Sequence, residues 1–169
     1  RCEVDEARLE VSKLLMAKPS EVIFTSGGTE SVNTAIRCLA QWRKRPLLIT
    51  SAVEHAAVRE QLEVLGRSGD QEVIVLPNDT SGIVSVEALE SLIASRGEDI
   101  ALVTVMWANN ETGTCHDLKP LARAVRASGI AWHCDAVQAA GKVPIDLESG
   151  AGRSISTLAL AAHKLGGPK

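Results

Sequence analysis

The apolar run Ile100-Ala101-Leu102-Val103-Thr104-Val105-Met106 restricts the fold more than any other stretch of the sequence. It has the length of a strand, and its apolar residues do not alternate with polar ones, which indicates that both faces are buried. Strands buried on both faces are typical of parallel sheets, because the crossover helices of such sheets pack on both sides. The run therefore predicts a central strand of a parallel sheet.

Shorter runs of the same kind alternate with helical patterns along the chain. Further strands are expected at residues 21–25, 47–50, 73–76, 130–134 and 155–161. Helices are expected at residues 3–17, 35–42, 58–65, 85–93 and 118–125. This alternation predicts one α/β domain with a mainly parallel sheet and helices on both faces.

Composition and charge exclude several classes of function. The chain of 169 residues is long enough for one domain with a core. Its formal net charge of -3 offers no basic surface for nucleic acid, and an aromatic content of 2% provides no stacking platform for single strands. No apolar run is long enough to span a bilayer. We therefore expect neither nucleic acid nor a membrane as a partner.

The cysteine and histidine residues do not form a disulfide or metal-binding pattern. The four cysteines are scattered and include no Cys-x-x-Cys pair, which favours reduced thiols in a cytoplasmic compartment. His133 and Cys134 are neighbours on an expected strand, so their side chains point to opposite faces and do not readily bind one ion. Even with Cys115 and His116 included, we expect no metal site.

Polar groups follow five of the expected strands, at the point where each strand ends. They are Ser26-Gly27-Gly28-Thr29, Glu54-His55, Asn109-Asn110-Glu111, Asp135 with Gln138, and His163-Lys164. In an open parallel sheet, ligands bind outside the carboxyl ends of the strands. The convergence of these groups on one edge predicts a ligand site there.

Lys164 follows the last apolar run and precedes Gly166-Gly167-Pro168, which reads as a turn. A lysine at a strand end lies near apolar cover, and burial lowers the pKa of its ammonium group. That is the property required of a lysine that forms a Schiff base. The alternative interpretation is a lysine that reaches solvent from the end of a strand.

Two further segments suggest a charged ligand. Gly27-Gly28-Thr29 can present backbone N–H groups and a hydroxyl at a helix N-terminus, which binds anions, although an ordinary glycine-rich helix start is equally compatible. Asp135 ends a strand and is expected to be partly buried, so it requires a cationic or hydrogen-bonding partner. A protonated pyridine nitrogen would serve, and the alternative is a capping or turn aspartate.

The remaining polar side chains have less specific interpretations. His55 could bind a metal, transfer protons or stack on a cofactor, and a structural histidine is the alternative. Asn110 and Gln138 are compatible with loop amides that bind the backbone.

Five motifs together resemble one family. They are Thr25-Ser26-Gly27-Gly28-Thr29-Glu30-Ser31, Glu54-His55-x-x-Val58, Asn109-Asn110-Glu111-Thr112-Gly113, His133-Cys134-Asp135-Ala136-Val137-Gln138 with Gly141-Lys142, and His163-Lys164-x-x-Gly167-Pro168-Lys169. In order and spacing they are similar to the NifS/IscS-type cysteine desulfurases, which belong to the class V aminotransferase group of pyridoxal 5'-phosphate (PLP) enzymes. The resemblance implies the large domain of a fold type I PLP-dependent transferase.

The resemblance also implies a role for each site residue. The catalytic residues would be Lys164 as the Schiff-base lysine, Asp135 as partner of the pyridine nitrogen, and His55 as a ring-stacking residue that assists proton transfer. The other cofactor contacts would be Asn110 and Gln138 at the ring and Gly28, Thr29 and His163 at the phosphate. No metal is implied.

Ala161 departs from the family pattern, which usually has serine two residues before the histidine of the His-Lys pair. The hydroxyl of that serine reaches the phosphate. Loss of one hydrogen bond to a charged group costs about 1.5–3 kcal/mol unless water or a neighbour replaces it. We therefore expect weaker PLP binding.

The activity implied is conversion of L-cysteine to L-alanine, with the sulfur held as a cysteine persulfide and passed to a sulfur-acceptor protein in iron-sulfur cluster assembly. Selenocysteine lyase, or another class V lyase or transferase, is the alternative enzyme. A non-catalytic module that keeps the sheet without the cofactor is the alternative of another class.

The chain opens on Arg1 and closes on Lys169 after a Gly-Pro turn, so we expect an internal piece of a longer protein. Residues 1–169 would be part of the PLP-binding large domain, without the N-terminal segment and the C-terminal small domain. The nucleophilic cysteine and the substrate-binding arginine of the family would then lie beyond Lys169. Family members are homodimers, and we expect the same of the full-length, cytoplasmic protein.

Overall fold

A computed structural model of the chain describes residues 2–167. Its centre is a sheet of five parallel strands in the order β2-β1-β3-β4-β5. The strands are β1 (Leu47–Ser51), β2 (Glu72–Leu76), β3 (Ile100–Thr104), β4 (Ala131–Asp135) and β5 (Thr157–Ala159). The prediction of a parallel α/β sheet is confirmed.

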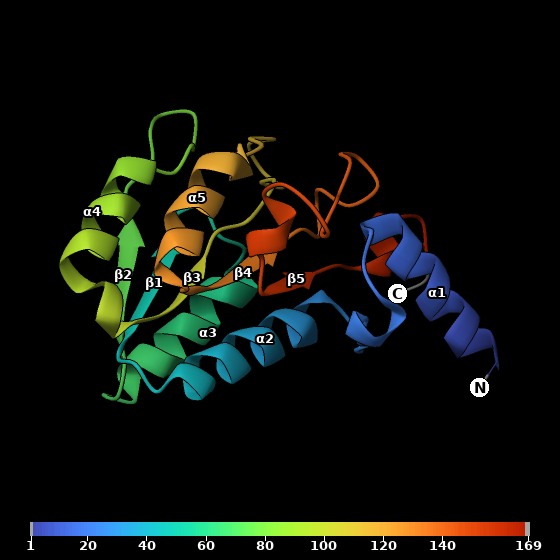
Figure 1. Ribbon diagram of the computed structural model, residues 1–169, viewed down its shortest axis with the longest axis horizontal. Coiled ribbons are helices and arrows are strands. Elements are labelled where there is room, and N and C mark those ends of the chain that lie inside the picture. Colours follow the sequence, from blue (N-terminus) through green and yellow to red (C-terminus); the bar gives the residue numbers. More distant parts are fainter. Residues whose placement is uncertain (1, 168–169) are drawn as a thin grey trace.

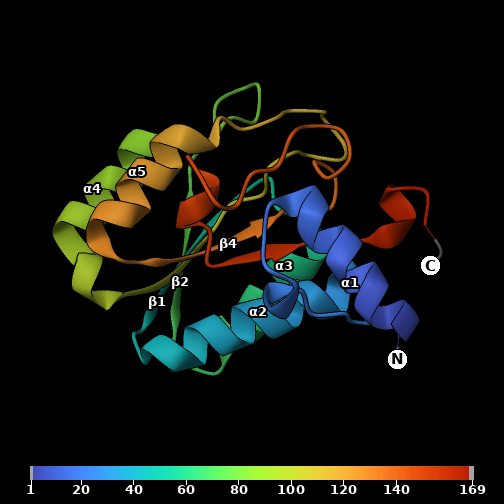
Figure 2. The ribbon, with the colours of Figure 1, turned by 45° about the vertical axis from the view of Figure 1, so that its right-hand side comes forward.

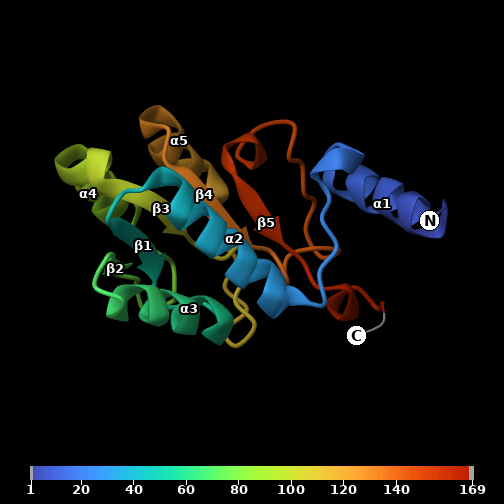
Figure 3. The same ribbon diagram turned by 90° about the horizontal axis from the view of Figure 1, so that it is seen from below.

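Helices cover both faces of the sheet (Figure 1), as predicted. Helices α2 (Gly28–Arg43) and α3 (Ala56–Arg67) pack on one face. Helices α4 (Val86–Arg96) and α5 (Leu118–Ser128) pack on the other. Figure 3 shows the two layers from below, with α2 and α3 separated from α4 and α5 by the strands.

Helix α1 (Cys2–Leu15) lies apart from these layers, beyond the β5 edge of the sheet (Figure 1 and Figure 2). Its last residue, Leu15, packs in a small cluster with Ala136, Ala140 and Ile145. The carbonyl of Leu15 also accepts a hydrogen bond of 3.1 Å from the Leu147 N–H. The helix is therefore attached to the segment that follows β4.

The apolar run at residues 100–106, which contains β3, forms the middle of the core. Every residue of β3 is buried, as is every residue of its neighbours β1 and β4. The β2 strand at the sheet edge is more exposed, with Val75 53% accessible. Burial on both faces thus decreases from the centre to the edge, as expected for a sheet sandwiched between helices.

Caps fix where several helices begin and end. The Ser85 side chain accepts from the Ala88 N–H at the start of α4, as predicted, and the Asp117 carboxylate accepts from the Lys119 N–H at the start of α5. Helix α5 ends at Gly129, whose φ of 63° is the left-handed conformation that favours glycine.

Two strand predictions were wrong. Residues 21–25 form no strand: a 3₁₀ helix, η1 (Pro19–Glu21), leads into extended chain, and Val22 bonds through its carbonyl to the Arg8 guanidinium. The apolar residues of this segment lack a neighbouring strand within residues 2–167, and Ile23 is 82% exposed.

The last strand is shorter than the expected residues 155–161, because the short helices η3 (Gly152–Ser154) and η4 (Ala162–Lys164) closely flank β5. Pro168 and Lys169, quoted in the last motif, lie outside the described residues.

The strand order creates a crevice at the carboxyl edge. From β1 the chain passes to α3 on one face, and from β3 it passes to α5 on the other. The connections after these adjacent strands therefore diverge, which is the arrangement at which open α/β sheets bind ligands. Within the described part of the chain, no helix is long and apolar enough to cross a membrane.

Candidate active site

A cavity of about 290 Å³ opens at the carboxyl edge of the sheet. All of the predicted site residues line it: Gly28, Thr29, His55, Asn110, Asp135, Gln138, His163 and Lys164. They come from the start of α2 and from the segments that follow β1, β3, β4 and β5. The sequence therefore identified the residues that the fold brings together, although their roles stay predictions.

The start of α2 forms one wall of the cavity. Gly27 is the N-cap in extended conformation, and Gly28 begins the helix. A Cβ on Gly28 would lie 3.4 Å from Val137 Cγ2 and 3.6 Å from Ala161 Cβ, so its absence leaves room at this wall. A helix N-terminus presents free N–H groups and a positive partial charge, which suits an anion.

Asp135 ends β4 and is buried, as predicted, with 5% of its surface accessible. One carboxylate oxygen accepts a hydrogen bond of 2.9 Å from the Val137 N–H. Burial raises the pKa of Asp135, while the Val137 N–H and the nearby His55 oppose the shift. Within residues 2–167 the carboxylate forms no ion pair, so it can receive a cationic group of a ligand.

His55 caps α3 and also lines the cavity. Its Nδ1 accepts a hydrogen bond of 3.2 Å from the Ala57 N–H. That bond uses the lone pair of Nδ1, so the neutral ring carries its proton on Nε2. The cap therefore fixes both the position of the ring and its tautomer.

The two asparagines of the Asn109-Asn110 pair differ in their contacts. The Asn109 side chain donates to the Val53 carbonyl at 2.8 Å and accepts from the N–H groups of Glu111 and Thr112, so it holds the loop together. Asn110 is exposed and lines the cavity. Of the two amides, only that of Asn110 is therefore open to a ligand, and its role as a cofactor contact stays a prediction.

Gln138 lies at the cavity with its side-chain oxygen already engaged. Its Oε1 accepts a hydrogen bond of 3.0 Å from the Lys142 ammonium group. The same ammonium group donates to the Gln138 carbonyl at 3.0 Å. The side-chain NH₂ group makes no hydrogen bond within residues 2–167, so Gln138 can offer it to a ligand.

Lys164 and His163 belong to η4, beyond the end of β5. Both side chains are exposed, so the burial expected of Lys164 from its position near apolar cover was wrong for the described residues. The physical reason is the early end of β5 at Ala159, followed by a turn in which the Lys164 N–H donates to the Ala161 carbonyl at 3.0 Å. The lysine nevertheless lines the same cavity as Asp135.

Sequence reasoning did not assign a role to Glu54, which is only 4% exposed beside the cavity. Its Oε1 accepts hydrogen bonds of 2.7 Å from both the Ser51 hydroxyl and the Met106 N–H. Burial raises the pKa of Glu54 to about 7, opposed by those two hydrogen bonds. The signal available in the sequence was an acidic residue just after a strand, the same signal that drew attention to Asp135.

The residues considered for a metal site are separated by the fold. His133 faces the α2 side and pairs through Nδ1 with the Thr157 hydroxyl at 2.9 Å, whereas Cys134 packs in the core on the α5 side. Within residues 2–167 no group of three or more potential ligands could hold a metal ion. All four cysteines are free, and Cys134 is the buried one.

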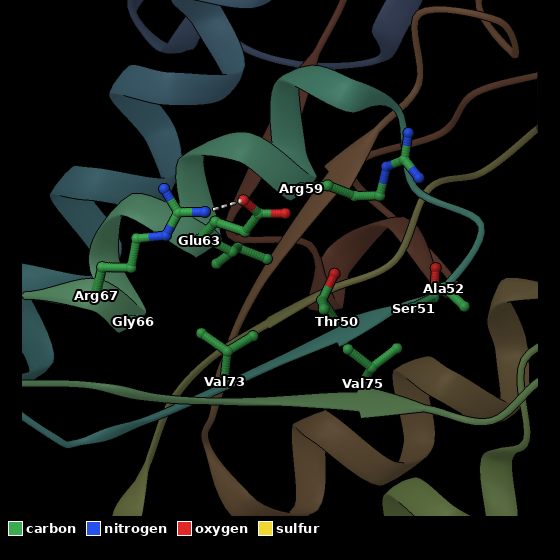
Figure 4. Close-up of a pocket in the computed structure, with 10 residues that line it drawn as sticks. Thr50, Ser51, Ala52, Arg59, Glu63, Gly66, Arg67, Val73 and Val75 are labelled. Atoms are coloured by element: carbon green, nitrogen blue, oxygen red, sulfur yellow. Dashed lines mark hydrogen bonds and ion pairs between the residues drawn. The ribbon is translucent and has the colours of Figure 1, made fainter. Parts of the chain in front are cut away.

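A second hollow, of about 340 Å³, lies between α3 and β2 (Figure 4). Its apolar lining includes Leu62, Val73 and Val75. Glu63 and Arg67 lie on its helical side and bond to each other at 3.1 Å. None of the residues predicted for the ligand site lies here.

The fold and the carboxyl-edge cavity together define an α/β protein with a candidate ligand site at the carboxyl ends of its parallel strands. The chain belongs to the class-V aminotransferase family, whose model matches residues 2–169. A curated relative, the cysteine desulfurase NifS of Azotobacter vinelandii, is 46% identical over 166 residues, which cover 97% of this chain and 40% of the relative. The cysteine desulfurase IscS of Shewanella loihica is 41% identical over 168 residues, which cover 98% of this chain and 40% of the relative.

A solved structure, SspA in complex with cysteine, matches with a TM-score of 0.89 and 34% identity. The match covers 98% of this chain and 46% of SspA. These similarities confirm the expected family and the fold of a fold type I large domain. The chain spans about 40% of the length of the curated relatives it matches.

Proposed function

We propose that this chain is the cofactor-binding part of a PLP-dependent cysteine desulfurase. The observation that carries the proposal is the convergence of all the predicted site residues on one cavity. Relatives named cysteine desulfurase, at 41% and 46% identity, support the same activity. The reaction would convert L-cysteine to L-alanine and leave its sulfur on an enzyme cysteine as a persulfide.

The residues of the cavity fit PLP at both of its charged ends. The start of α2, with Gly28 and Thr29, offers N–H groups and a hydroxyl to a phosphate. Asp135 offers a buried carboxylate without an ion-pair partner in the described chain to a protonated pyridine nitrogen. Lys164, exposed at the same cavity, offers an amine.

Each residue would then have a distinct task. PLP, when bound, supplies a ring that withdraws electrons from the substrate's reacting carbon. Asp135 would keep the ring nitrogen protonated, which maintains that withdrawal. The Lys164 amine would hold the cofactor covalently and, once released by the substrate amine, accept and return a proton.

The other side chains would orient the ring and the phosphate. His55 would stack on the ring, with its Nε2 proton available because Nδ1 already accepts from the backbone. Asn110 and the free NH₂ group of Gln138 would contact the ring side. His163 would contact the phosphate together with Gly28 and Thr29.

We further propose that residues 1–169 are part of a large domain and that a small domain completes the full-length protein. The coverage of 40% of the curated relatives supports this division. The nucleophilic cysteine and the arginine that binds the substrate carboxylate would belong to that further part. We propose a cytoplasmic homodimer that passes sulfur to an acceptor protein for iron-sulfur cluster assembly.

L-Cysteine is the proposed substrate, and the complex of SspA with cysteine supports it. The test is to incubate the full-length protein with PLP, L-cysteine and a thiol reductant, and to measure alanine and sulfide. Equal amounts of both products, lost in a Lys164→Ala variant, are expected. Absence of alanine from L-cysteine would contradict the proposal, and turnover of L-selenocysteine alone would indicate a lyase for that substrate.

A further inference from the structure

Glu54 is buried where the carboxyl ends of β1 and β3 meet. Its Oε1 accepts hydrogen bonds from the Ser51 hydroxyl, at the end of β1, and from the Met106 N–H, just beyond β3. Its carboxyl group therefore ties together the two strand ends from which the connections to α3 and α5 diverge. Met106 itself lines the cavity, and His55 is the next residue along the chain.

The two oxygens of this carboxyl group have different surroundings. Both donors bind Oε1, at 2.7 Å each, while Oε2 is buried and has no hydrogen-bond partner in the described chain. In a neutral carboxylic acid the carbonyl oxygen is the better acceptor, and the hydroxyl oxygen carries the proton. The asymmetry fits a neutral acid with its carbonyl at Oε1 and its proton on Oε2, since an ionised group would leave a buried charged oxygen unpaired.

The groups that face Glu54 offer no positive charge to stabilise an anion. The Ser51 hydroxyl of β1 donates to Glu54, and the groups of β4 that interact electrostatically with it, Asp135 and Cys134, carry no positive charge. No ion pair within residues 2–167 includes Glu54. Burial and the proximity of Asp135 raise the pKa of Glu54 to about 7, although both hydrogen bonds oppose the shift.

Asp135 is the better place for the single negative charge. Its carboxylate accepts from the Val137 N–H at 2.9 Å, lies near His55 and opens onto the cavity. Glu54 has only neutral donors and is closed off from solvent. Two carboxyl groups that are close together in a low dielectric do not readily both ionise, so the less favoured one keeps its proton.

We propose that Glu54 is a positioning residue that keeps its carboxyl proton in the folded protein up to about neutral pH, so that in this range Glu54 and Asp135 together carry one negative charge, located on Asp135. The protonation of Glu54 does not depend on the proposed function. Only the role of the Asp135 charge, which is to hold the protonated ring nitrogen of PLP, rests on that function. Neutral Glu54 thus holds the ends of β1 and β3 together without adding a second anion near Asp135.

A direct test is infrared spectroscopy of the full-length protein without PLP. The wild type should show, at about pH 6, a protonated carboxyl band that disappears as the pH rises through about 7. Glu54→Gln should lack this band, and Glu60→Gln, which changes an exposed residue of α3, should retain it. Absence of the band from the wild type, or its persistence in Glu54→Gln, would overturn the proposal.

The pH dependence of folding provides a second test. The folded protein keeps a proton that the unfolded chain releases above a pKa of 4.5, so wild-type stability should fall as the pH rises from there to about 7. Relative to the wild type, the folded-to-unfolded ratio of Glu54→Gln should rise about tenfold for each pH unit in that window. If the difference in stability between Glu54→Gln and the wild type did not change with pH in this window, Glu54 would not keep its proton in the folded protein.

Both measurements are made without PLP, so failure of the proposed desulfurase activity would leave them unaffected. If Glu54→Gln does not fold, the infrared titration of the wild type alone decides the question. In that case a carboxyl band that titrates near pH 7 supports the proposal, and its absence at about pH 6 refutes it.

Discussion

Two hollows of similar size differ in what their side chains leave unpaired. One, of about 340 Å³, lies between α3 and β2 and takes its charged side chains from one helix. Two of these, Glu63 and Arg67, pair with each other. The carboxyl-edge cavity, of about 290 Å³, takes polar groups from the segments after four strands and from the start of α2.

In the carboxyl-edge cavity, the charged groups Asp135 and Lys164 have no ion-pair partner in the described chain. The pairing of the side chains therefore distinguishes two hollows of similar size. A ligand site is recognised by polar groups that separate elements bring together and that await a partner. We therefore expect substitutions in the two hollows to have very different effects.

The largest effect is expected for Lys164→Ala in the full-length protein. Loss of the amine removes both the covalent link to PLP and a proton-transfer group, so alanine formation should fall by about 10³-fold or more. The matched control in the other hollow is Arg67→Ala, which should change the rate by less than about twofold. A similar loss in both variants would erase the distinction between the hollows.

The next effect is expected for Asp135→Ala. Loss of the carboxylate opposite the ring nitrogen should lower turnover by about 10²-fold, because electrostatic stabilisation of a developing charge is removed. Folding should be nearly normal, since the substitution removes a buried group whose pKa is raised by burial. Turnover is measured as alanine release and folding by thermal unfolding. Near-normal turnover would refute the proposed role.

Ala161→Ser should strengthen PLP binding in the cavity. Ala161 is buried at the cavity wall, and a hydroxyl there would restore a hydrogen bond to the phosphate. A gain of about 1.5–3 kcal/mol corresponds to a PLP dissociation constant at least about tenfold lower. The matched control is Ala52→Ser, which places the same hydroxyl in the hollow between α3 and β2.

For both serine variants the PLP dissociation constant is measured by equilibrium dialysis. A change for Ala161→Ser equal to that for Ala52→Ser would show that the phosphate does not lie beside residue 161.

The smallest effect is expected for Val75→Thr in the α3–β2 hollow. Val75 is 53% exposed, so the free energy of unfolding should change by no more than about 0.5 kcal/mol. The PLP dissociation constant should stay within about twofold of the wild type. Denaturant unfolding and dialysis check the two values. A tenfold loss of PLP affinity would mean that this hollow contributes to the site.

The sequence was sufficient to predict the fold and the site residues where a local pattern determined the structure. Complete burial of β3 followed from its unbroken apolar run, and the meeting of Asp135 and Lys164 at one edge followed from the parallel sheet. Residues 21–25 have the composition of a strand, but a strand also needs a neighbour to pair with. That requirement depends on tertiary structure and is invisible in local composition.

The environment of Glu54 could not be predicted for a related reason. Its hydrogen bond from the Met106 N–H spans 52 positions in the sequence and depends on β1 lying beside β3. The order of strands in a sheet is not encoded in any one segment. Sequence patterns thus indicated which residues meet, but not the burial and hydrogen bonding that set the protonation of Glu54.

The central claim is that the carboxyl-edge cavity binds PLP through Lys164. The most direct measurement is borohydride reduction of the PLP-loaded full-length protein, followed by peptide mapping of the labelled lysine. We expect label on Lys164, and none after Lys164→Ala. Label on another lysine, such as Lys142 beside Gln138, or no label at all, would contradict it.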